Sequence, residues 1–101
     1  MRSKAPKAKL LHRERIEFPD GTFAELVLWG VPEPVPPTTH GFKYRLAYVV
    51  GGKRVVGYDN ERGKGDHRHY DGTETPYQFE SANKVLADFR TDVKRYRGDM
   101  S

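Results

Sequence analysis

The sequence predicts an α+β fold: a small antiparallel sheet of four to five strands with one C-terminal helix packed on one face. Two observations predict it. Strand-like segments joined by short turns fill most of the chain before residue 71, and one stripe of apolar residues at helical spacing follows residue 81. A length of 101 residues leaves room for one domain. We therefore expect a basic flexible tail over residues 1–9 and a single domain over residues 10–98.

The first predicted hairpin comes directly after the basic tail. Residues 10–18 have a strand-like pattern, and residues 22–31 form a second strand with apolar side chains on both faces. Between them, Pro19-Asp20-Gly21 is a turn with a physical basis, because proline presets its backbone angle and glycine accepts a positive φ.

A proline-rich segment, residues 32–41, separates this hairpin from the next. It excludes a central strand or a helix interior, so we interpret it as an extended crossover. Residues 42–50 then alternate clearly, and Gly51-Gly52 turns the chain into a strand over residues 53–58. A two-residue turn places Asp59 on the face of Leu46, whereas a three-residue loop places Tyr58 there, and the sequence leaves both open.

The C-terminal segment predicts the only helix. Its apolar stripe has helical spacing, and Ser81 and Gly98 are suited to cap its two ends. The preceding polar segment, residues 71–76, is interpreted as a turn. The stripe consists of Ala82, Val85, Leu86, Phe89, Val93 and Tyr96.

Composition narrows the classes of function. The chain has no cysteine, which excludes disulfides and thiolate metal sites. It shows no secretory signal and no apolar run long enough for a membrane span, so we expect a cytoplasmic protein. Residues 1–15 carry a net charge of +5, against −1 for residues 16–101. The basic tail is either a non-specific nucleic-acid contact or a solubilising end.

The segment from Tyr58 to Tyr70, YDNERGKGDHRHY, concentrates the reactive side chains. If its second half is extended, His67 and His69 project from one face and Arg68 from the other. Two histidines on one face are the minimum for acid–base cleavage of RNA, because one imidazole removes a proton while the other donates one. Asp59 or Glu61 would orient a histidine or act as the base.

Other residues of the same segment have the chemistry to bind phosphate or bases. Glycine amides and cations suit an anion, and tyrosines can stack on bases, although flanking tyrosines are more often packing residues. The candidate RNA-binding residues are Arg62, Gly63, Lys64, Gly65, Arg68, Tyr58 and Tyr70. A weaker alternative is a metal site formed by Asp66, His67 and His69. Otherwise we expect no metal and no cofactor.

The run FKYRLAYVVGGKRVVGYDNERGKGDHRHY, followed by ADFRTDVKR, resembles the TumE family of small proteins from bacteria and archaea. The most specific part is Tyr58-Asp59-Asn60 followed by Gly63-Lys64-Gly65 and His67-Arg68-His69. Members are toxin components of type II toxin–antitoxin systems. The resemblance implies a growth-inhibiting toxin and a cognate antitoxin, typically a helix-turn-helix DNA-binding protein. It does not imply a catalytic assignment.

Three hypotheses follow for the function. The first is a small, metal-independent ribonuclease that uses His67 and His69. The second is a non-catalytic module that binds nucleic acid or the ribosome through charge and stacking. The third is a metal-dependent enzyme that uses the His-x-His motif. The sequence leaves open the oligomeric state, the RNA sequence preference and the way in which an antitoxin neutralises the protein.

Overall fold

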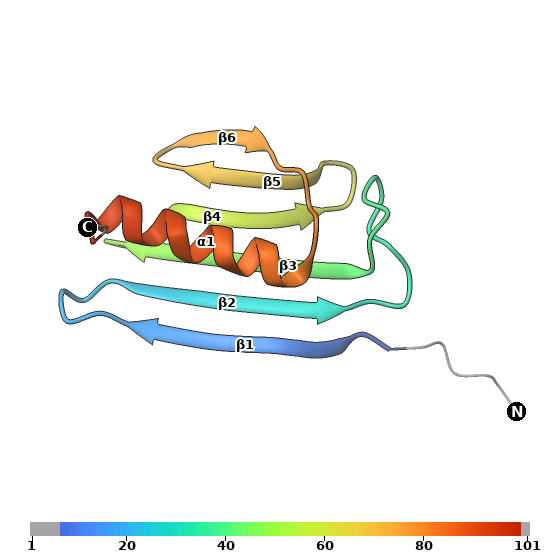
Figure 1. Ribbon diagram of the computed structural model, residues 1–101, viewed down its shortest axis with the longest axis horizontal. Helices are drawn as coiled ribbons and strands as arrows, with labels where there is room; N and C mark the ends of the chain where they lie inside the picture. Colours follow the sequence, from blue (N-terminus) through green and yellow to red (C-terminus); the bar gives the residue numbers. More distant parts are fainter. Residues whose placement is uncertain (1–6, 100–101) are drawn as a thin grey trace, which may run out of the picture.

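The computed structural model of the chain describes residues 7–99. It shows an α+β fold in which one antiparallel sheet carries one helix on one face (Figure 1). The prediction of a basic tail falls largely on residues 1–6, which lie outside the described residues. The first strand begins at Lys9, one residue before the predicted domain boundary.

The sheet is a meander in which each strand pairs with the next one along the chain. Its order is β1-β2-β3-β4-β5-β6, and every pair is antiparallel. The strands are β1 (Lys9–Glu17), β2 (Phe23–Gly30), β3 (Phe42–Val50), β4 (Lys53–Glu61), β5 (Gly65–Tyr70) and β6 (Thr73–Pro76).

The structure has six strands and not the expected four to five, because β6 lies within residues 71–76, for which the sequence predicts a turn. Its four residues, TETP, are all exposed and include no large apolar side chain, so the sequence offers no strand signal there. Asp71 and Gly72, both at positive φ, form the tight turn that returns the chain alongside β5.

The β3–β4 hairpin resolves the open question of register. Gly51 and Gly52 form a two-residue turn at positive φ, and Val50 lies opposite Lys53. A β-bulge then intervenes, because Tyr48 pairs with Val56 while Val49 pairs with Arg54. Tyr58 consequently lies opposite Leu46, on the face that the helix covers, and Asp59 projects from the other face.

The helix α1 (Ala82–Arg97) lies across β3 and β4 (Figure 1). Ser81 accepts a hydrogen bond from the Lys84 amide at 3.0 Å, and Gly98 ends the helix at φ 74°, as the sequence predicts. No helix within residues 7–99 is long and apolar enough to span a membrane. The core between sheet and helix is built from Ala24, Leu26, Leu28, Tyr44, Leu46, Tyr48, Val56, Tyr58, Val85, Phe89 and Val93.

The opposite face of the sheet is covered by no element within residues 7–99. We call it the open face. The proline-rich segment, residues 32–41, lies in the loop between the neighbouring strands β2 and β3 and is not a crossover over the sheet. It lies beside the β4–β5 turn, where the Gly63 amide donates to the Pro36 carbonyl at 2.8 Å (Figure 1).

Candidate functional site

The ladder between β4 and β5 brings the two histidines together with Asp59. His67 lies opposite Asp59, and His69 lies opposite Gly57. Because residues directly opposite each other share a face, these side chains all belong to the open face. Arg68 pairs with Tyr58 and projects from the helix face. The predicted separation of the histidines from Arg68 is therefore confirmed.

Within residues 7–99, one ring nitrogen of His67 has a hydrogen-bond partner and the other has none. Its Nδ1 lies 3.1 Å from the carbonyl oxygen of Gly65. A carbonyl oxygen only accepts, so Nδ1 carries the proton in this contact. In a neutral imidazole the other nitrogen, Nε2, then has a free lone pair and can accept a proton.

His69 lies between two carboxylates. Its buried Nε2 is 3.5 Å from Asp59 Oδ1 and 3.7 Å from Glu74 Oε2, without a formed hydrogen bond. Within residues 7–99 its Nδ1 has no hydrogen-bond partner. A protonated imidazole carries an N–H group on each ring nitrogen, so in His69 the second N–H group, on Nδ1, can donate.

Basic side chains complete the charge arrangement around Asp59, which is 7% exposed. Arg54 donates to Asp59 at 3.0 Å. Its side chain passes over Gly57, where an added Cβ would come within 2.7 Å of it. Lys64 donates to Glu74 at 3.1 Å, a bond that raises the pKa of Lys64 and lowers the pKa of Glu74.

The Gly63-Lys64-Gly65 turn does not present a set of free amides to an anion. The Gly63 amide donates to Pro36, and the Lys64 amide donates to Glu61 at 3.0 Å. The exposed side chains of Glu61 and Arg62 lie at this turn. A phosphate would therefore meet the side chains of Arg62 and Lys64 rather than a backbone cradle.

The structure does not bring Arg68, Tyr58 or Tyr70 to the histidines. Arg68 and Tyr58 both donate to Asp92 Oδ2 on α1, at 2.7 and 2.6 Å. The Arg68 guanidinium also lies over the Tyr70 ring, 4.9 Å from its centre. The hydrogen bond to Asp92 raises the pKa of Arg68, and burial raises that of Tyr58. This cluster connects the sheet to the helix.

Asp66 also projects from the helix face, away from the two histidines. It accepts hydrogen bonds from His40 at 2.8 Å and from Tyr44 at 2.5 Å, and His40 stacks on Phe79. The weaker alternative of a metal site at Asp66, His67 and His69 therefore has its three residues divided between two faces. In the described part of the chain, no three His, Cys, Asp or Glu side chains group closely enough to hold a metal ion.

Sequence reasoning missed three residues near the histidines: Arg54, Glu74 and Arg45. Arg45 lies opposite Asp59 on β3, is exposed, and has no ion pair within residues 7–99. Finding Arg54 or Arg45 required the register of the β3–β4 hairpin, which the bulge decides. Glu74 required β6, for which the sequence gives no apolar signal.

These features define a small basic α+β protein with a histidine–carboxylate cluster on an uncovered sheet face. The chain matches the family model described as Toxin TumE over residues 4–97. It belongs to the TumE family. A search of curated proteins and a search of solved structures each gave no match. Membership supports a role as a toxin and suggests an antitoxin as a partner.

Proposed function

We propose that this toxin acts on RNA as a metal-independent ribonuclease through the open face of its sheet. The observation that supports the proposal is the placement of His67 and His69 on one sheet face, each with one ring nitrogen that has no hydrogen-bond partner within residues 7–99. Side chains two residues apart on a strand are separated by roughly 7 Å, enough for one phosphodiester between them.

The proposed reaction transfers two protons. Nε2 of His67 removes the proton of a 2′-hydroxyl, and the 2′-oxygen attacks the adjacent phosphorus. Nδ1 of protonated His69 donates its proton to the departing 5′-oxygen. The products are a 2′,3′-cyclic phosphate and a 5′-hydroxyl, and no redox or metal chemistry is required. The carboxylates of Asp59 and Glu74 lie 3.5 and 3.7 Å from Nε2 of the same imidazole.

Cations are available for the phosphates on either side of the reacting one. Arg45 lies two strands from His67, roughly 10 Å away across the sheet. Arg62 is exposed at the β4–β5 turn. In this proposal these arginines, together with Lys64, hold RNA and make its affinity fall as salt rises. The expected partner that restrains the toxin is a helix-turn-helix antitoxin.

The test is induced expression followed by sequencing of RNA ends, with wild type compared with His67→Ala and His69→Ala. We expect discrete new ends in the wild type, and loss of both the ends and growth inhibition in each variant. His12→Ala is the matched control, because it removes a histidine from β1 without touching the cluster. Thermal unfolding must show that all variants remain folded.

Two results would contradict the proposal. Undiminished toxicity in both histidine variants would remove the acid–base assignment. Growth inhibition without any new RNA ends would favour the non-catalytic binding module. Loss of growth inhibition in Arg45→Ala and Arg62→Ala would strengthen that conclusion. Loss of cleavage on chelation, restored by added metal, would instead favour the metal-dependent alternative.

A further inference from the structure

The open face carries a second feature besides the histidines, the side chain of Trp29. Trp29 is the only tryptophan of the chain, and it lies near the end of β2. Its neighbour Leu28 is buried in the core, so the alternation of side chains along a strand places Trp29 on the open face. Its side chain is half-buried and takes no part in the core between sheet and helix. Partly exposed tryptophans are typical of binding surfaces, because the ring offers a large apolar area with a polar N–H group.

The indole ring of Trp29 can still accept a stacking partner. Within residues 7–99, no aromatic ring stacks on it and no cation lies over it. Phe23, on the same face of β2, differs because the Arg15 guanidinium lies 4.0 Å from the centre of its ring. Trp29 is therefore the aromatic side chain of this strand that is suited to stack on a base.

The residues that surround Trp29 in the sheet include three cations. Lys43 lies opposite Trp29 on β3, and its Nζ donates to the backbone carbonyl of Asn60. Arg13 and Arg45 lie on the two strands that flank β2, in register with Val27. Both are exposed and have no ion pair within residues 7–99. We call this set of side chains the tryptophan patch: Leu10, Arg13, Val27, Trp29, Lys43 and Arg45.

The strand carboxylates of the open face lie outside this patch. Four of them have cationic partners: Glu17 and Glu25 share Arg15, Asp59 pairs with Arg54, and Glu74 pairs with Lys64. The fifth, Glu61, is exposed at the β4–β5 turn and has no ion pair within residues 7–99. The part of this face most attractive to a phosphate is therefore the tryptophan patch.

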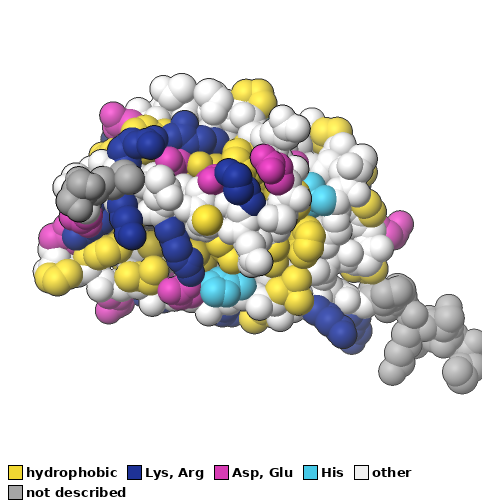
Figure 2. Space-filling view, in the orientation of Figure 1, with side chains coloured by type: hydrophobic (Ala, Val, Ile, Leu, Met, Phe, Trp, Pro, Cys, Tyr) yellow, Lys and Arg dark blue, Asp and Glu magenta, His cyan; other side chains and the backbone are white. Residues whose placement is uncertain are grey.

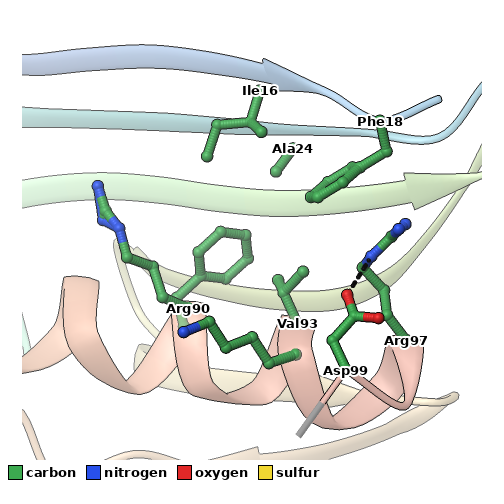
Figure 3. A pocket seen from close by; sticks show the side chains of 9 residues that line it. Ile16, Phe18, Ala24, Arg90, Val93, Arg97 and Asp99 are labelled. Carbon is green, nitrogen blue, oxygen red and sulfur yellow. Dashed lines mark hydrogen bonds and ion pairs between the residues drawn. The ribbon is translucent and has the colours of Figure 1, made fainter.

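The helix face offers a phosphate less. Figure 2 views that face and shows basic side chains next to acidic ones. The groove between α1 and the first two strands contains two arginines whose charges are already paired (Figure 3). Arg90 donates to Glu14 at 2.5 Å, and Arg97 donates to Asp20 and Asp99 at 3.0 and 2.8 Å. The groove is also lined mainly by apolar side chains, so it does not suit a polyanion.

We propose that the tryptophan patch binds single-stranded RNA, with one unpaired base stacked on Trp29 and with Arg13 and Arg45 holding phosphates of the same strand. The proposal rests on the proposed action on RNA and names the class of substrate. Aromatic rings beside cations bind single strands of any sequence, because every base has a face that can stack. In duplex RNA the bases are already stacked on one another, so they do not reach an indole on a sheet.

The patch lies in line with the histidines. Arg13 of β1 and Arg45 of β3 belong to the same row of paired residues as His67 of β5. Neighbouring strands lie about 4.8 Å apart, so the row from His67 to Arg13 spans roughly 19 Å. Trp29 is three strands and two residues from His67, roughly 16 Å by the same spacing. One strand of RNA that crosses the sheet therefore places the base on Trp29 a few nucleotides from the bond between the histidines.

The first test uses the fluorescence of Trp29, which reports on this position alone because the chain has no other tryptophan. The probe is an RNA of about ten nucleotides, within the usual site size for single strands. Its 2′-oxygens are methylated, so the full-length protein cannot cleave it. The controls are the same sequence as a duplex and a sugar–phosphate chain of the same length without bases. We expect the single strand to quench the fluorescence and both controls to leave it nearly unchanged.

Protein variants test the stacking through the fluorescence anisotropy of a labelled probe. Trp29→Ala should weaken binding roughly 5- to 150-fold, the loss expected for one stacked base. Trp29→Phe keeps an aromatic ring and should have an affinity between those of wild type and Trp29→Ala. Phe23→Leu is the matched control, because Arg15 already covers that ring, and it should bind as wild type does. Trp29→Phe keeps the test decisive if Trp29→Ala fails to fold.

Charge variants test the phosphate contacts. Arg13→Ala and Arg45→Ala should each reduce the slope of log affinity against log salt concentration by about 0.7, the value for one phosphate contact with a single strand. Lys94→Ala is the control, because it removes an exposed cation of the helix that has no ion pair within residues 7–99. It should leave the slope unchanged. Unchanged slopes in both arginine variants would contradict the proposal.

Failure of this proposal and failure of the ribonuclease proposal give different results. New RNA ends in cells without quenching of Trp29 would overturn the patch and leave the ribonuclease proposal standing. Quenching without new RNA ends would support the patch and remove the ribonuclease.

Three further results would overturn the proposal. Equal quenching by the duplex or by the chain without bases would exclude stacking on an unpaired base. Emission that changes with protein concentration alone would assign Trp29 to contact with a second copy. A Trp29→Ala protein that binds RNA as wild type does but escapes its antitoxin would assign the residue to a protein partner.

Discussion

Asp92→Ala tests whether Tyr58 and Arg68 have a structural role, in contrast to the histidines of the same segment. The Asp92 carboxylate is 5% exposed and accepts hydrogen bonds from both Tyr58 and Arg68. Removing it leaves a buried phenol and a partly buried guanidinium without their acceptor. We therefore expect a loss of stability and no direct effect on the open face.

The magnitude follows from the two partners. A buried hydroxyl that loses its acceptor costs about 1–3 kcal/mol. Tyr58 is 2% exposed and would keep only the hydrogen bond that it accepts from Arg68 at 3.2 Å, so this cost applies to its unpaired O–H group. The Arg68 side chain is 31% exposed, so water partly replaces its lost ion pair with Asp92. This loss therefore adds only about 1 kcal/mol to the destabilisation. The total is about 2–4 kcal/mol, which lowers the melting temperature by roughly 10–25 °C in a domain of this size.

The assay is urea and thermal unfolding of wild type and variants, followed by RNA binding on the folded proteins. Asp99→Ala is the control, because it removes a carboxylate that is 51% exposed in a surface ion pair and should cost under about 1 kcal/mol. An Asp92→Ala protein within 1 kcal/mol of wild type would refute the reasoning. So would an Arg68→Leu protein of unchanged stability and weakened RNA binding, since Arg68 would then act as a phosphate ligand.

Two further predictions concern acid stability and the proline-rich loop. The hydrogen bond with His12 is the main cause that lowers the pKa of Glu14 below its ordinary value of 4.5. The stability that this carboxylate contributes is therefore present above about pH 4.5 and lost as pH falls through the lowered value, so melting temperatures should fall less steeply with acid in Glu14→Gln. If the melting temperatures of wild type and Glu14→Gln fall equally with pH, Glu14 does not contribute this stability. His40→Ala removes the stacking on Phe79 and the bond to Asp66, and should cost about 1–3 kcal/mol in urea unfolding and speed amide hydrogen exchange at Gly63. Unchanged exchange would show that His40 does not hold the loop.

Local patterns in the sequence were sufficient to predict most of the fold. Strand β3 occupies the predicted residues 42–50, and the helix has the predicted caps at Ser81 and Gly98. These elements depend on side chains that alternate or recur within a few residues. Strand β6 depends instead on pairing with β5, so its polar residues carry no signal of their own.

The site could be predicted only in part, for the same reason. That His67 and His69 share a face follows from their spacing of two. Which residues surround them depends on contacts between distant segments. His40 reaches Asp66 across 26 positions, and Arg68 reaches Asp92 across 24. Sequence spacing carries no information about either contact, so the candidate RNA-binding residues include three, Tyr58, Arg68 and Tyr70, that lie on the other face.

The β-bulge beside Val55 is the feature that divides the molecule into its two surfaces. Without the additional residue, β4 would present Asp59 to the helix and Tyr58 to the open face. With it, the phenol of Tyr58 packs in the core and reaches Asp92, while the carboxylate of Asp59 lies beside both histidines. One face then carries the two histidines with Asp59, and the other holds the helix and the core. The same local irregularity thus places the histidine–carboxylate cluster and the core packing on opposite faces of one sheet.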